Sequence, residues 1–441
     1  MPIEVEHLRK PHRSRLRCSV PHRKRPWRPT RIGFARDRAR VKDVATAARA
    51  GQPALKILHV VADLDPARGG AGTACLGMAK VMARRGHQVR IVTTDRGYGP
   101  APLQQDHTLE IEALPGSWPA FFGTSWPLWR RLREIVPKMD VVHLHALYLF
   151  HDWAAARFCW RHGISYVVTP HGALDPFIYR RHRWRKLIVE AAFQNEVSRR
   201  ASGLQFTTAE EWRLARPQAA NARGCIIPIG IDLDAFDRLP SRAALRARYS
   251  MIGDRRVVLF LGRLSFKKGI DIVIRAFSEI ARERDDVFLV IAGPDDGMRA
   301  SAEALVAECG IAGRCLFTGM VSGEEKRVVL GGSDFFLLAS LSENFGISVV
   351  EAAACGIPVA ISDRVNLWRE FRDAQAGLTA PPTVPDFARQ LRFLLENPEA
   401  AADIGRRGAE LARRFSWAGL GPEYEQMYAT AARENALPEL A

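Results

Sequence analysis

The sequence predicts an α/β protein with two domains, each built on a doubly wound parallel sheet. The first observation is an alternation of short apolar runs with helical patterns, which begins near residue 55. The second is that a new alternating series starts after residue 241. The third is the length, because 441 residues suffice for two domains of ordinary size with separate cores. Parallel sheets of this type bind ligands beyond the carboxyl ends of their strands.

The composition is that of a globular protein, with 47% hydrophobic and 25% charged residues. No apolar run in the sequence approaches the roughly 20 residues that a membrane span needs. The Arg-rich start lacks the apolar region of a secretory signal. Seven dispersed cysteines without a Cys-x-x-Cys pair fit a reducing compartment and argue against a disulfide framework or structural zinc.

Positive charge is concentrated at the N-terminus. Residues 1–50 hold 15 Lys and Arg against 4 Asp and Glu, which is +11 of the +16 carried by the whole chain. Because residues 1–53 show no sustained hydrophobic period, we expect a basic, disordered extension there. The alternative is an electrostatic tether to anionic lipid or to nucleic acid.

The first domain is expected to begin with a buried strand at 55–61. A glycine-rich turn containing Gly69 and Gly70 separates it from a helical run. Glycines let the backbone approach an anion at a helix N-terminus, so both are candidate ligand contacts. The turn lacks the spacing of a dinucleotide fingerprint or a P-loop, and a turn without a ligand is the alternative. Further strands are expected at 88–92, 141–145, 166–169 and 204–207.

Two histidines fall at predicted strand ends. His145 closes the run that starts at Val141, and His171 follows the run that ends at Thr169. Because the carboxyl ends of parallel strands border ligand sites, both are candidates for substrate contact. The alternative for each is a purely structural role.

The second domain is expected to follow a linker at 226–232, with Ser241 capping a helix at 242–248. Its strands are expected at 257–261, 287–291, 315–318, 335–338 and 359–361. The first of these leads into a loop that carries Arg263 and Lys268 ahead of a helix. Such a pair can hold a diphosphate, since Arg binds it through two hydrogen bonds and Lys as a point charge.

Two carboxylates lie near the start of a later helix. The pattern becomes helical after Gly346, which places Glu343 on a strand-to-helix loop and Glu351 inside the helix. Backbone N–H groups of Asn344, Phe345 and Gly346 are expected to point at the ligand of this loop. Because carboxylates accept hydrogen bonds from hydroxyls, the arrangement suits a polyol attached to a phosphate.

These segments resemble the family 4 retaining glycosyltransferases. Ser342-Glu343-Asn344-Phe345-Gly346, Glu351-Ala352 and Cys355-Gly356-Ile357-Pro358-Val359 resemble the family's donor-sugar motif, written as Glu, seven residues, Glu. A Pro that usually precedes this Ser is replaced by Leu338-Ala339-Ser340, a departure that affects the turn. The donor-phosphate segment is matched at Gly262, Arg263, Lys268 and Gly269. Val142-His143-Leu144-His145 and Thr169-Pro170-His171-Gly172 are similar to its N-terminal domain, and Pro228-Ile229-Gly230-Ile231-Asp232 to its linker, with Ile229 where Asn is usual.

The resemblance implies the GT-B fold, in which two Rossmann-like domains face one cleft, and covers roughly residues 55–430. Residues 54–235 would form an acceptor-binding domain, residues 236–415 a donor-binding domain, and residues 416–441 a helix that crosses back to the first. The implied activity is retaining transfer of a hexosyl-type sugar from a nucleoside-diphosphate sugar to an acceptor hydroxyl, in cell-surface polysaccharide or glycolipid biosynthesis as in the bacterial members.

The resemblance also assigns roles to residues. Arg263 and Lys268 would stabilise the departing diphosphate, and Glu351 would bind the ribose. Glu343, with the backbone N–H groups of Asn344, Phe345, Gly346 and Ile347, would hold the sugar ring. On the first domain, Gly70 would border the donor, Gly69 and His171 would lie on the acceptor side, and His145 would contact the donor sugar near its 6-hydroxyl. Glu343, His145, Lys268 and Arg263 are thus the expected catalytic group, with no covalent nucleophile.

No cofactor or metal is expected beyond the sugar-nucleotide co-substrate. No Asp-x-Asp segment lies at a strand end in a context typical of Mg²⁺ binding, and the nearest candidate, Asp63-Leu64-Asp65, lies in the first domain away from the donor motifs. Two rival functions stay open: another GT-B activity, such as nucleotide-sugar epimerisation or phosphorolysis, and a non-enzymatic binder of nucleic acid acting through the basic tail. For the transferase, no nucleic-acid partner is expected.

Two stretches combine aromatic and basic residues. The first runs through Trp118, Phe121, Phe122, Trp126, Trp129, Arg130, Arg131 and Arg133, and the second through Arg180, Arg181, Arg183, Trp184, Arg185 and Lys186 to Leu187, Ile188 and Val189. Trp with Arg favours a bilayer interface, so peripheral contact with the anionic inner face of the membrane is one interpretation. A lipid-linked saccharide would be presented there to a cytoplasmic enzyme. An aromatic core with an exposed basic face is the alternative.

Overall fold

The computed structural model describes residues 53–95, 109–119, 122–181, 183–219 and 223–438. Residues 53–441 form one compact unit. The expected basic extension, apart from residue 53, lies outside the described residues, as does Phe121 of the first aromatic stretch. Within the described part, no helix is both long and apolar enough to pass through a membrane.

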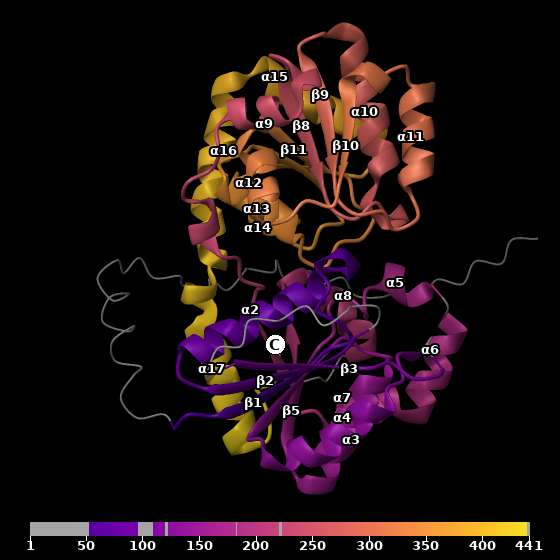
Figure 1. Ribbon diagram of the computed structural model, residues 1–441, viewed down its shortest axis with the longest axis vertical. Coiled ribbons are helices and arrows are strands. Elements are labelled where there is room, and N and C mark those ends of the chain that lie inside the picture. The colour runs from indigo at the N-terminus through magenta and orange to yellow at the C-terminus, as the bar shows by residue number, and fades with distance from the viewer. Residues whose placement is uncertain (1–52, 96–108, 120–121, 182, 220–222, 439–441) are drawn as a thin grey trace, which may run out of the picture. The chain divides into compact units, whose positions relative to one another are not determined.

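The first lobe, coloured indigo to magenta in Figure 1, contains a fully parallel sheet. Its strand order is β3-β2-β1-β4-β5-β6-β7. Its strands are β1 (Lys56–Val60), β2 (Gln88–Thr94), β3 (Leu109–Leu114), β4 (Val141–His145), β5 (Ser165–Thr169), β6 (Gly203–Phe206) and β7 (Gly224–Ile226). The strand order reverses between β1 and β4, so the loops that follow these two strands part and leave space for a ligand.

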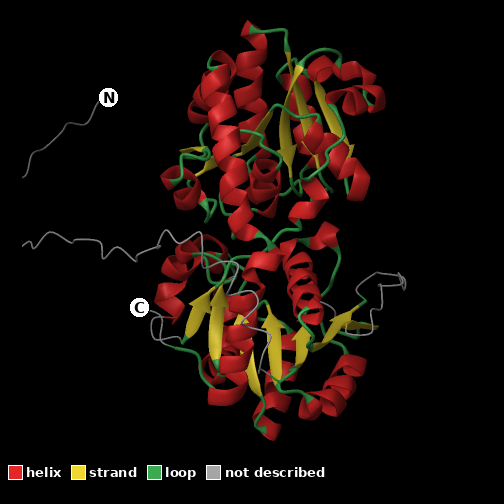
Figure 2. Ribbon diagram, turned by 90° about the vertical axis from the view of Figure 1, so that its left-hand side faces the viewer, coloured by secondary structure: helices red, strands yellow, loops and turns green. Residues whose placement is uncertain are grey.

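Helices pack on both faces of this sheet, as a doubly wound topology requires (Figure 2). They are α2 (Gly70–Arg84), α3 (Trp126–Ile135), α4 (Phe150–His162), α5 (Pro176–Arg180), α6 (Arg183–Val189), α7 (Asn195–Arg200) and α8 (Ala209–Ala219). A π-helical turn at Glu190–Gln194 joins α6 to α7.

The second lobe repeats the plan, with a parallel sheet in the order β10-β9-β8-β11-β12-β13. Its strands are β8 (Arg256–Leu261), β9 (Val287–Ala292), β10 (Cys315–Gly319), β11 (Phe335–Leu338), β12 (Val359–Ser362) and β13 (Leu378–Ala380). Its helices are α9 (Arg242–Arg248), α10 (Ile270–Glu283), α11 (Arg299–Glu308), α12 (Gly323–Gly331), α13 (Ile347–Ala354), α14 (Trp368–Asp373), α15 (Val384–Glu396) and α16 (Pro398–Ala412). The order reverses between β8 and β11. The prediction of two doubly wound parallel sheets is confirmed.

Three strands were missing from the sequence-based prediction: β3, β7 and β13. Each is an edge strand of its sheet, and two of them have only three residues. Edge strands bury less surface, so their hydrophobic pattern is weaker than that of the central strands. Ser241 occupies the expected N-cap position of α9, but its side chain makes no capping hydrogen bond.

The last helix, α17 (Trp417–Glu434), packs on α2, β4 and β5 of the first lobe. It begins at Trp417, although Gly419, Gly421 and Pro422 weaken the helical signal of its first turns. Ser416 caps it by accepting a hydrogen bond from the Gly419 N–H at 3.0 Å. A Cβ atom on Gly77 would lie 2.1 Å from the Trp417 ring, so only glycine leaves room for this contact.

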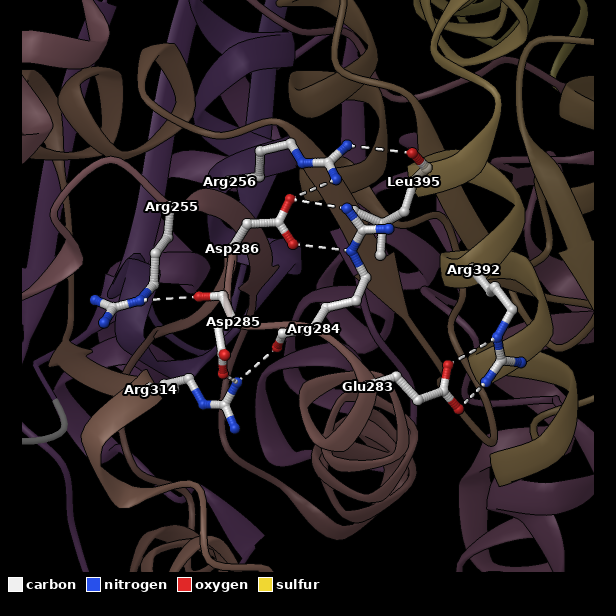
Figure 3. Close-up of polar contacts among 9 residues, drawn as sticks. All are labelled: Arg255, Arg256, Glu283, Arg284, Asp285, Asp286, Arg314, Arg392 and Leu395. Carbon is white, nitrogen blue, oxygen red and sulfur yellow. Dashed lines mark hydrogen bonds and ion pairs between the residues drawn. The ribbon is translucent and has the colours of Figure 1, made fainter.

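A charged cluster covers the amino ends of β8 and β9 (Figure 3). Arg256 donates to Asp286 at 2.7 Å and to the Leu395 carbonyl at 3.2 Å. Arg284 donates to both oxygens of Asp286, and these bonds, more than any other interaction, hold the pKa of that carboxyl below its usual range. Exposed pairs of this kind contribute little stability each. Ligands of such sheets bind beyond the carboxyl ends of the strands, so this cluster lies at the opposite end from the candidate site.

Candidate active site

The predicted site residues gather around the two points where the strand orders reverse. Loops after β1 and β4 supply the contribution of the first lobe, and loops after β8 and β11 supply that of the second. The predicted residues at these strand ends are Gly69, Gly70, His145, Arg263, Lys268 and Glu343.

Lys268 and Glu343 form an ion pair between the loops after β8 and β11. The Lys268 ammonium contacts Glu343 Oε2, and the two side chains are 12% and 15% exposed. Burial alone would raise the pKa of Glu343, but the charges of Lys268 and Lys267 outweigh it and lower the pKa. Burial in turn lowers the pKa of Lys267. The pair therefore presents an ionised carboxylate and a cation at one point.

Arg263 faces the glycine turn of the first lobe. Its Nη1 donates to Asp296 at 2.8 Å, and a Cβ atom on Gly69 would lie 3.6 Å from its Nη2. A Cβ atom on Gly70 would meet the Ile347 side chain at 3.3 Å. Because Gly69 and Gly70 have no side chains, the Arg263 guanidinium and the start of α13 lie close to the backbone of this turn.

The start of α13 has the properties of an anion site. Its N-cap, Gly346, adopts the left-handed conformation at φ 84°. The first N–H groups of a helix have no intrahelical acceptor and carry a partial positive charge. The Phe345 side chain is 2% exposed and packs edge-on against Phe415 at 5.6 Å, so it anchors the loop while its backbone stays at the site.

Asn344 joins the two lobes, a contact that the sequence did not predict. Its Nδ2 donates to Thr207 Oγ1 at 3.1 Å, and its Oδ1 lies 3.1 Å from where a Cβ on Gly172 would be. Glu211 accepts hydrogen bonds from the Thr207 N–H and hydroxyl and from the Gly172 N–H, each at 2.7 Å. Burial raises the pKa of Glu211. No motif marks Thr207 or Glu211, because their role depends on the packing of the other lobe.

Glu351 lies in α13, as expected, and is paired with a lysine that the sequence did not single out. Lys326 of α12 donates to Glu351 Oε1 at 2.6 Å, and the side chains are 29% and 13% exposed. Both residues line a cavity of about 350 Å³ bordered by α2, α12, α13 and the segment before the second lobe. Lys326 is 25 residues from Glu351 in sequence, so no local pattern could reveal the pair.

His145 belongs to a row of buried imidazoles. Its Nε2 lies 2.9 Å from His59 Nδ1, and its Nδ1 lies 3.1 Å from His171 Nε2. His145 is fully buried and both of its ring nitrogens are engaged, whereas His171 is half-buried. In this arrangement His171 is the member of the row nearer to the ligand space, and the predicted contact of His145 with a sugar stays a prediction.

The backbone at these strand ends is strained. Ala146, Tyr148 and His171 have φ values of 85°, 70° and 50°. Non-glycine residues rarely adopt this region, and where they do the surrounding structure must hold them. Strain of this kind clusters at functional sites, which favours a ligand site beyond β4 and β5.

The buried histidines predict a loss of stability in acid. Burial lowers the pKa of His59 to about 3 and that of His171 to about 4. The unfolded chain takes up these protons below about pH 6.5, so it binds more protons than the folded chain and the stability falls as the pH falls. Between about pH 6.5 and its folded-state pKa, each histidine should lower the free energy of unfolding by about 1.4 kcal/mol for every unit that the pH falls.

Urea unfolding at pH 7, 6 and 5 measures this slope. His171→Asn should reduce this slope by the contribution of one histidine. Equal slopes in the His171 variant and the wild type would contradict the assignment.

One group of three side chains among the described residues has the spacing of metal ligands. His59, Cys75 and His145 are buried, and their ligand atoms lie within 4.8 Å of one another. The two histidines already hydrogen-bond to each other, and burial raises the pKa of the Cys75 thiol, which disfavours the thiolate that binds metals. These residues are a poor fit for a metal ion.

Two family profiles match the chain. The profile of Glycosyltransferase Family 4 matches residues 68–235, and that of Glycosyl transferases group 1 matches residues 241–411. The chain belongs to glycosyltransferase family 4. It is a glycosyltransferase enzyme with the GT-B fold.

Curated relatives of this glycosyltransferase are similar over most of their length. GDP-mannose:cellobiosyl-diphosphopolyprenol alpha-mannosyltransferase of Komagataeibacter xylinus is 25% identical over 402 residues, covering 88% of this chain and 96% of the relative. D-inositol 3-phosphate glycosyltransferase of Rhodococcus jostii is 28% identical over 378 residues, covering 79% and 82%.

Solved structures share the fold. HepE of Anabaena, in complex with UDP and glucose, superposes with a TM-score of 0.72 at 18% identity, covering 85% of this chain and all of that one. Sucrose-phosphate synthase of Thermosynechococcus elongatus gives a TM-score of 0.70 at 23% identity, covering 85% and 98%.

The two aromatic and basic stretches of the glycosyltransferase differ in their surroundings. In the first, Leu128 and Leu132 of α3 are buried and Arg131 pairs with Glu112 and Glu134. None of the described aromatic side chains of this stretch is fully buried: Phe122 and Trp129 are partly exposed, and Trp118 and Trp126 are 86% and 54% exposed. In the second, no residue of α6 is buried.

Proposed function

We propose that the enzyme transfers a hexosyl-type sugar from a nucleoside-diphosphate sugar to an acceptor hydroxyl, with retention of the anomeric configuration. The observation that carries the proposal is the convergence of Arg263, Lys268 and Glu343 near the start of α13, opposite the glycine turn after β1. This combination of cations, free N–H groups and a carboxylate can hold an anion and a polyol together.

In this proposal the second lobe holds the donor. Arg263 and Lys268 bind the diphosphate, and Glu351 accepts hydrogen bonds from the ribose hydroxyls after exchanging its contact with Lys326. Glu343 and the N–H groups from Asn344 to Ile347 hold the sugar ring. Gly70 lets the first lobe approach the donor without a side chain in between, and Gly69 and His171 border the acceptor.

The proposed chemistry is a front-face displacement. The bond between the anomeric carbon and the phosphate oxygen breaks, and a bond to the acceptor oxygen forms on the same face. The acceptor proton passes to the departing phosphate oxygen, giving the glycoside and a nucleoside diphosphate. The charge that grows on the diphosphate is stabilised by Lys268 and Arg263.

We propose that this stabilisation needs no metal and that the enzyme uses no cofactor. Support comes from the charges in place: Lys268, Lys267 and Arg263 all act on Glu343 and so lie around one point. Fixed cations at the leaving group can supply the electrostatic stabilisation that a divalent ion gives elsewhere. Adding EDTA should leave the rate unchanged.

The acceptor is proposed to be a saccharide or a lipid-linked saccharide, in cell-surface polysaccharide or glycolipid biosynthesis at the cytoplasmic face of the membrane. Two names support this class: the Komagataeibacter relative is named for a diphosphopolyprenol acceptor, and WaaG, similar in fold at a TM-score of 0.65, is described as involved in lipopolysaccharide biosynthesis. The exposed apolar and basic helix α6 of the first lobe is a further support.

Thermal-shift measurements with UDP, GDP and ADP test the donor class first. The matching diphosphate should raise the melting temperature, since a ligand at about 100 times its Kd stabilises by about 2.7 kcal/mol. The corresponding labelled sugar nucleotide should then yield a labelled glycoside with acceptor, and only slow hydrolysis without it. Epimerised donor, or release of a sugar 1-phosphate, would instead support the rival GT-B activities. Deleting residues 1–53 tests the other rival: a tail-driven binder would lose its nucleic-acid binding, whereas the transferase should keep its hydrolysis of the donor.

A further inference from the structure

Helix α6 carries its apolar side chains on the outside. Trp184, Leu187 and Ile188 are 62%, 47% and 61% exposed. Their spacing of three and four residues puts them on one helical face. A surface helix normally turns such a face towards the core. In the part of the chain that the structure describes, nothing buries this face.

A lysine and a glutamate hold the helix to the protein instead. Lys186 Nζ donates to the Ile178 carbonyl at 2.7 Å and lies over the rings of Tyr148 and Tyr179. Glu190, one turn further on, accepts hydrogen bonds from both tyrosine hydroxyls at 2.8 and 2.9 Å. Burial lowers the pKa of Lys186, partly offset by Glu190. The segment is therefore inverted, with polar side chains inward and apolar ones outward.

Arginines flank the apolar face. At about 100° per residue, Arg183 and Arg185 fall on opposite sides of it, and Arg180 precedes the helix. All three are exposed, and none forms an ion pair with another described residue. The Arg185 guanidinium lies 5.2 Å from the Trp184 ring. Apolar side chains between cations, with Trp at the rim, match the interface of an anionic bilayer.

The same segment borders the acceptor side of the site. α5 begins after Asp175, whose carboxylate accepts a hydrogen bond from the Ser342 hydroxyl at 3.2 Å, next to Glu343. The Arg181 guanidinium lies 4.3 Å from the centre of the Phe266 ring, just before Lys268. The short helix α5, which precedes α6 in the chain, thus lies against the candidate active site.

We propose that α6 docks the enzyme on an anionic membrane leaflet, with Trp184, Leu187 and Ile188 entering the interfacial layer and Arg183 and Arg185 contacting lipid phosphates. This places the acceptor side of the first lobe at the lipid surface, where a membrane-bound acceptor is presented. The role of docking in presenting the acceptor rests on the proposed function, whereas docking itself needs neither donor nor acceptor.

Vesicle flotation of the full chain tests the proposal, with vesicles of phosphatidylcholine and phosphatidylglycerol in about a 3:1 ratio. Replacing Trp184, Leu187 and Ile188 together by Ser should weaken partitioning by about tenfold or more. Arg183→Glu with Arg185→Glu should weaken it more in these vesicles than in pure phosphatidylcholine. The matched control, Met251→Ser with Phe393→Ser, changes exposed apolar residues of the second lobe and should not affect binding.

Equal partitioning of the wild type and the α6 Ser variant would overturn the proposal, since it would assign binding to the basic tail. Loss of a dimer in sedimentation velocity, without any change in flotation, would also overturn it in favour of a second copy as the occupant. Unchanged melting temperatures show that the variants fold. Transfer to a water-soluble acceptor should persist in the α6 Ser variant, so a failure of docking is distinguishable from a failure of the proposed transferase.

Discussion

Lys268→Ala is expected to lower kcat by about 100- to 1000-fold, the size of effect seen when one charge-stabilising donor is removed from an active site. Lys268 is mostly buried and contacts Glu343 next to the helix start that would receive the leaving diphosphate. The lost cation acts where negative charge grows in the transition state. The KM for the donor should therefore change less than kcat. Steady-state kinetics with the donor found by thermal shift measure both.

Stability must be separated from chemistry in this variant. Without Lys268, the Glu343 carboxylate keeps Lys267 and Arg263 nearby but loses its direct partner, and breaking a buried pair costs up to about 3–5 kcal/mol. Combining Lys268→Met with Glu343→Gln removes both charges, so it should recover stability without recovering activity. Lys267→Ala, a neighbouring cation without the ion pair, is the matched control and should reduce kcat far less. Full activity in Lys268→Ala would refute the assignment to the diphosphate.

The sequence was sufficient to predict which loops meet at the candidate site. Arg263 and Lys268 follow β8 and Glu343 follows β11, and these central strands are buried apolar runs that are easy to recognise. Topology then brings the loops together, because the strand order reverses between these two strands. Local pattern and fold class were enough to predict which loops meet, while the roles of the residues stay predictions.

Contacts between distant segments could not be predicted in this way. The pairing of Lys326 with Glu351, the bond from Asn344 to Thr207 and the row from His59 to His171 each join elements far apart in sequence. Their formation depends on helix orientation and on packing between the lobes. No periodicity or motif in a single sequence records either.

The exposure of side chains on α3 and α6 could not be predicted from the sequence either. α3 and α6 have similar compositions of Trp, Arg and Leu, yet Leu128 and Leu132 of α3 are fully buried whereas Leu187 of α6 is 47% exposed. The difference arises because Phe150 and Trp153 of α4 pack against Trp129 of α3, whereas α6 is attached through Lys186. Composition alone therefore could not predict which of these leucines are buried.

Glu351→Ala is expected to lower kcat/KM for the donor by about 10- to 100-fold, since hydrogen bonds to a charged group contribute about 1.5–3 kcal/mol. Glu351 would bind the ribose, away from the bond that breaks, so the loss should fall mainly on the KM for the donor. The variant also leaves the Lys326 ammonium without its carboxylate at 2.6 Å, in the cavity beside α13.

Lys326→Met distinguishes the two contributions. If Lys326 only occupies Glu351 until the ribose replaces it, its removal should leave kcat unchanged and the donor KM equal or lower. A large rise in KM for Lys326→Met would instead mean that the lysine orients the carboxylate and is itself a positioning residue. Glu351→Gln retains an acceptor oxygen and removes the charge, so its KM should lie between those of the wild type and Glu351→Ala. A Glu351→Ala enzyme with the wild-type donor KM would exclude Glu351 from the ribose site, whatever the behaviour of Lys326.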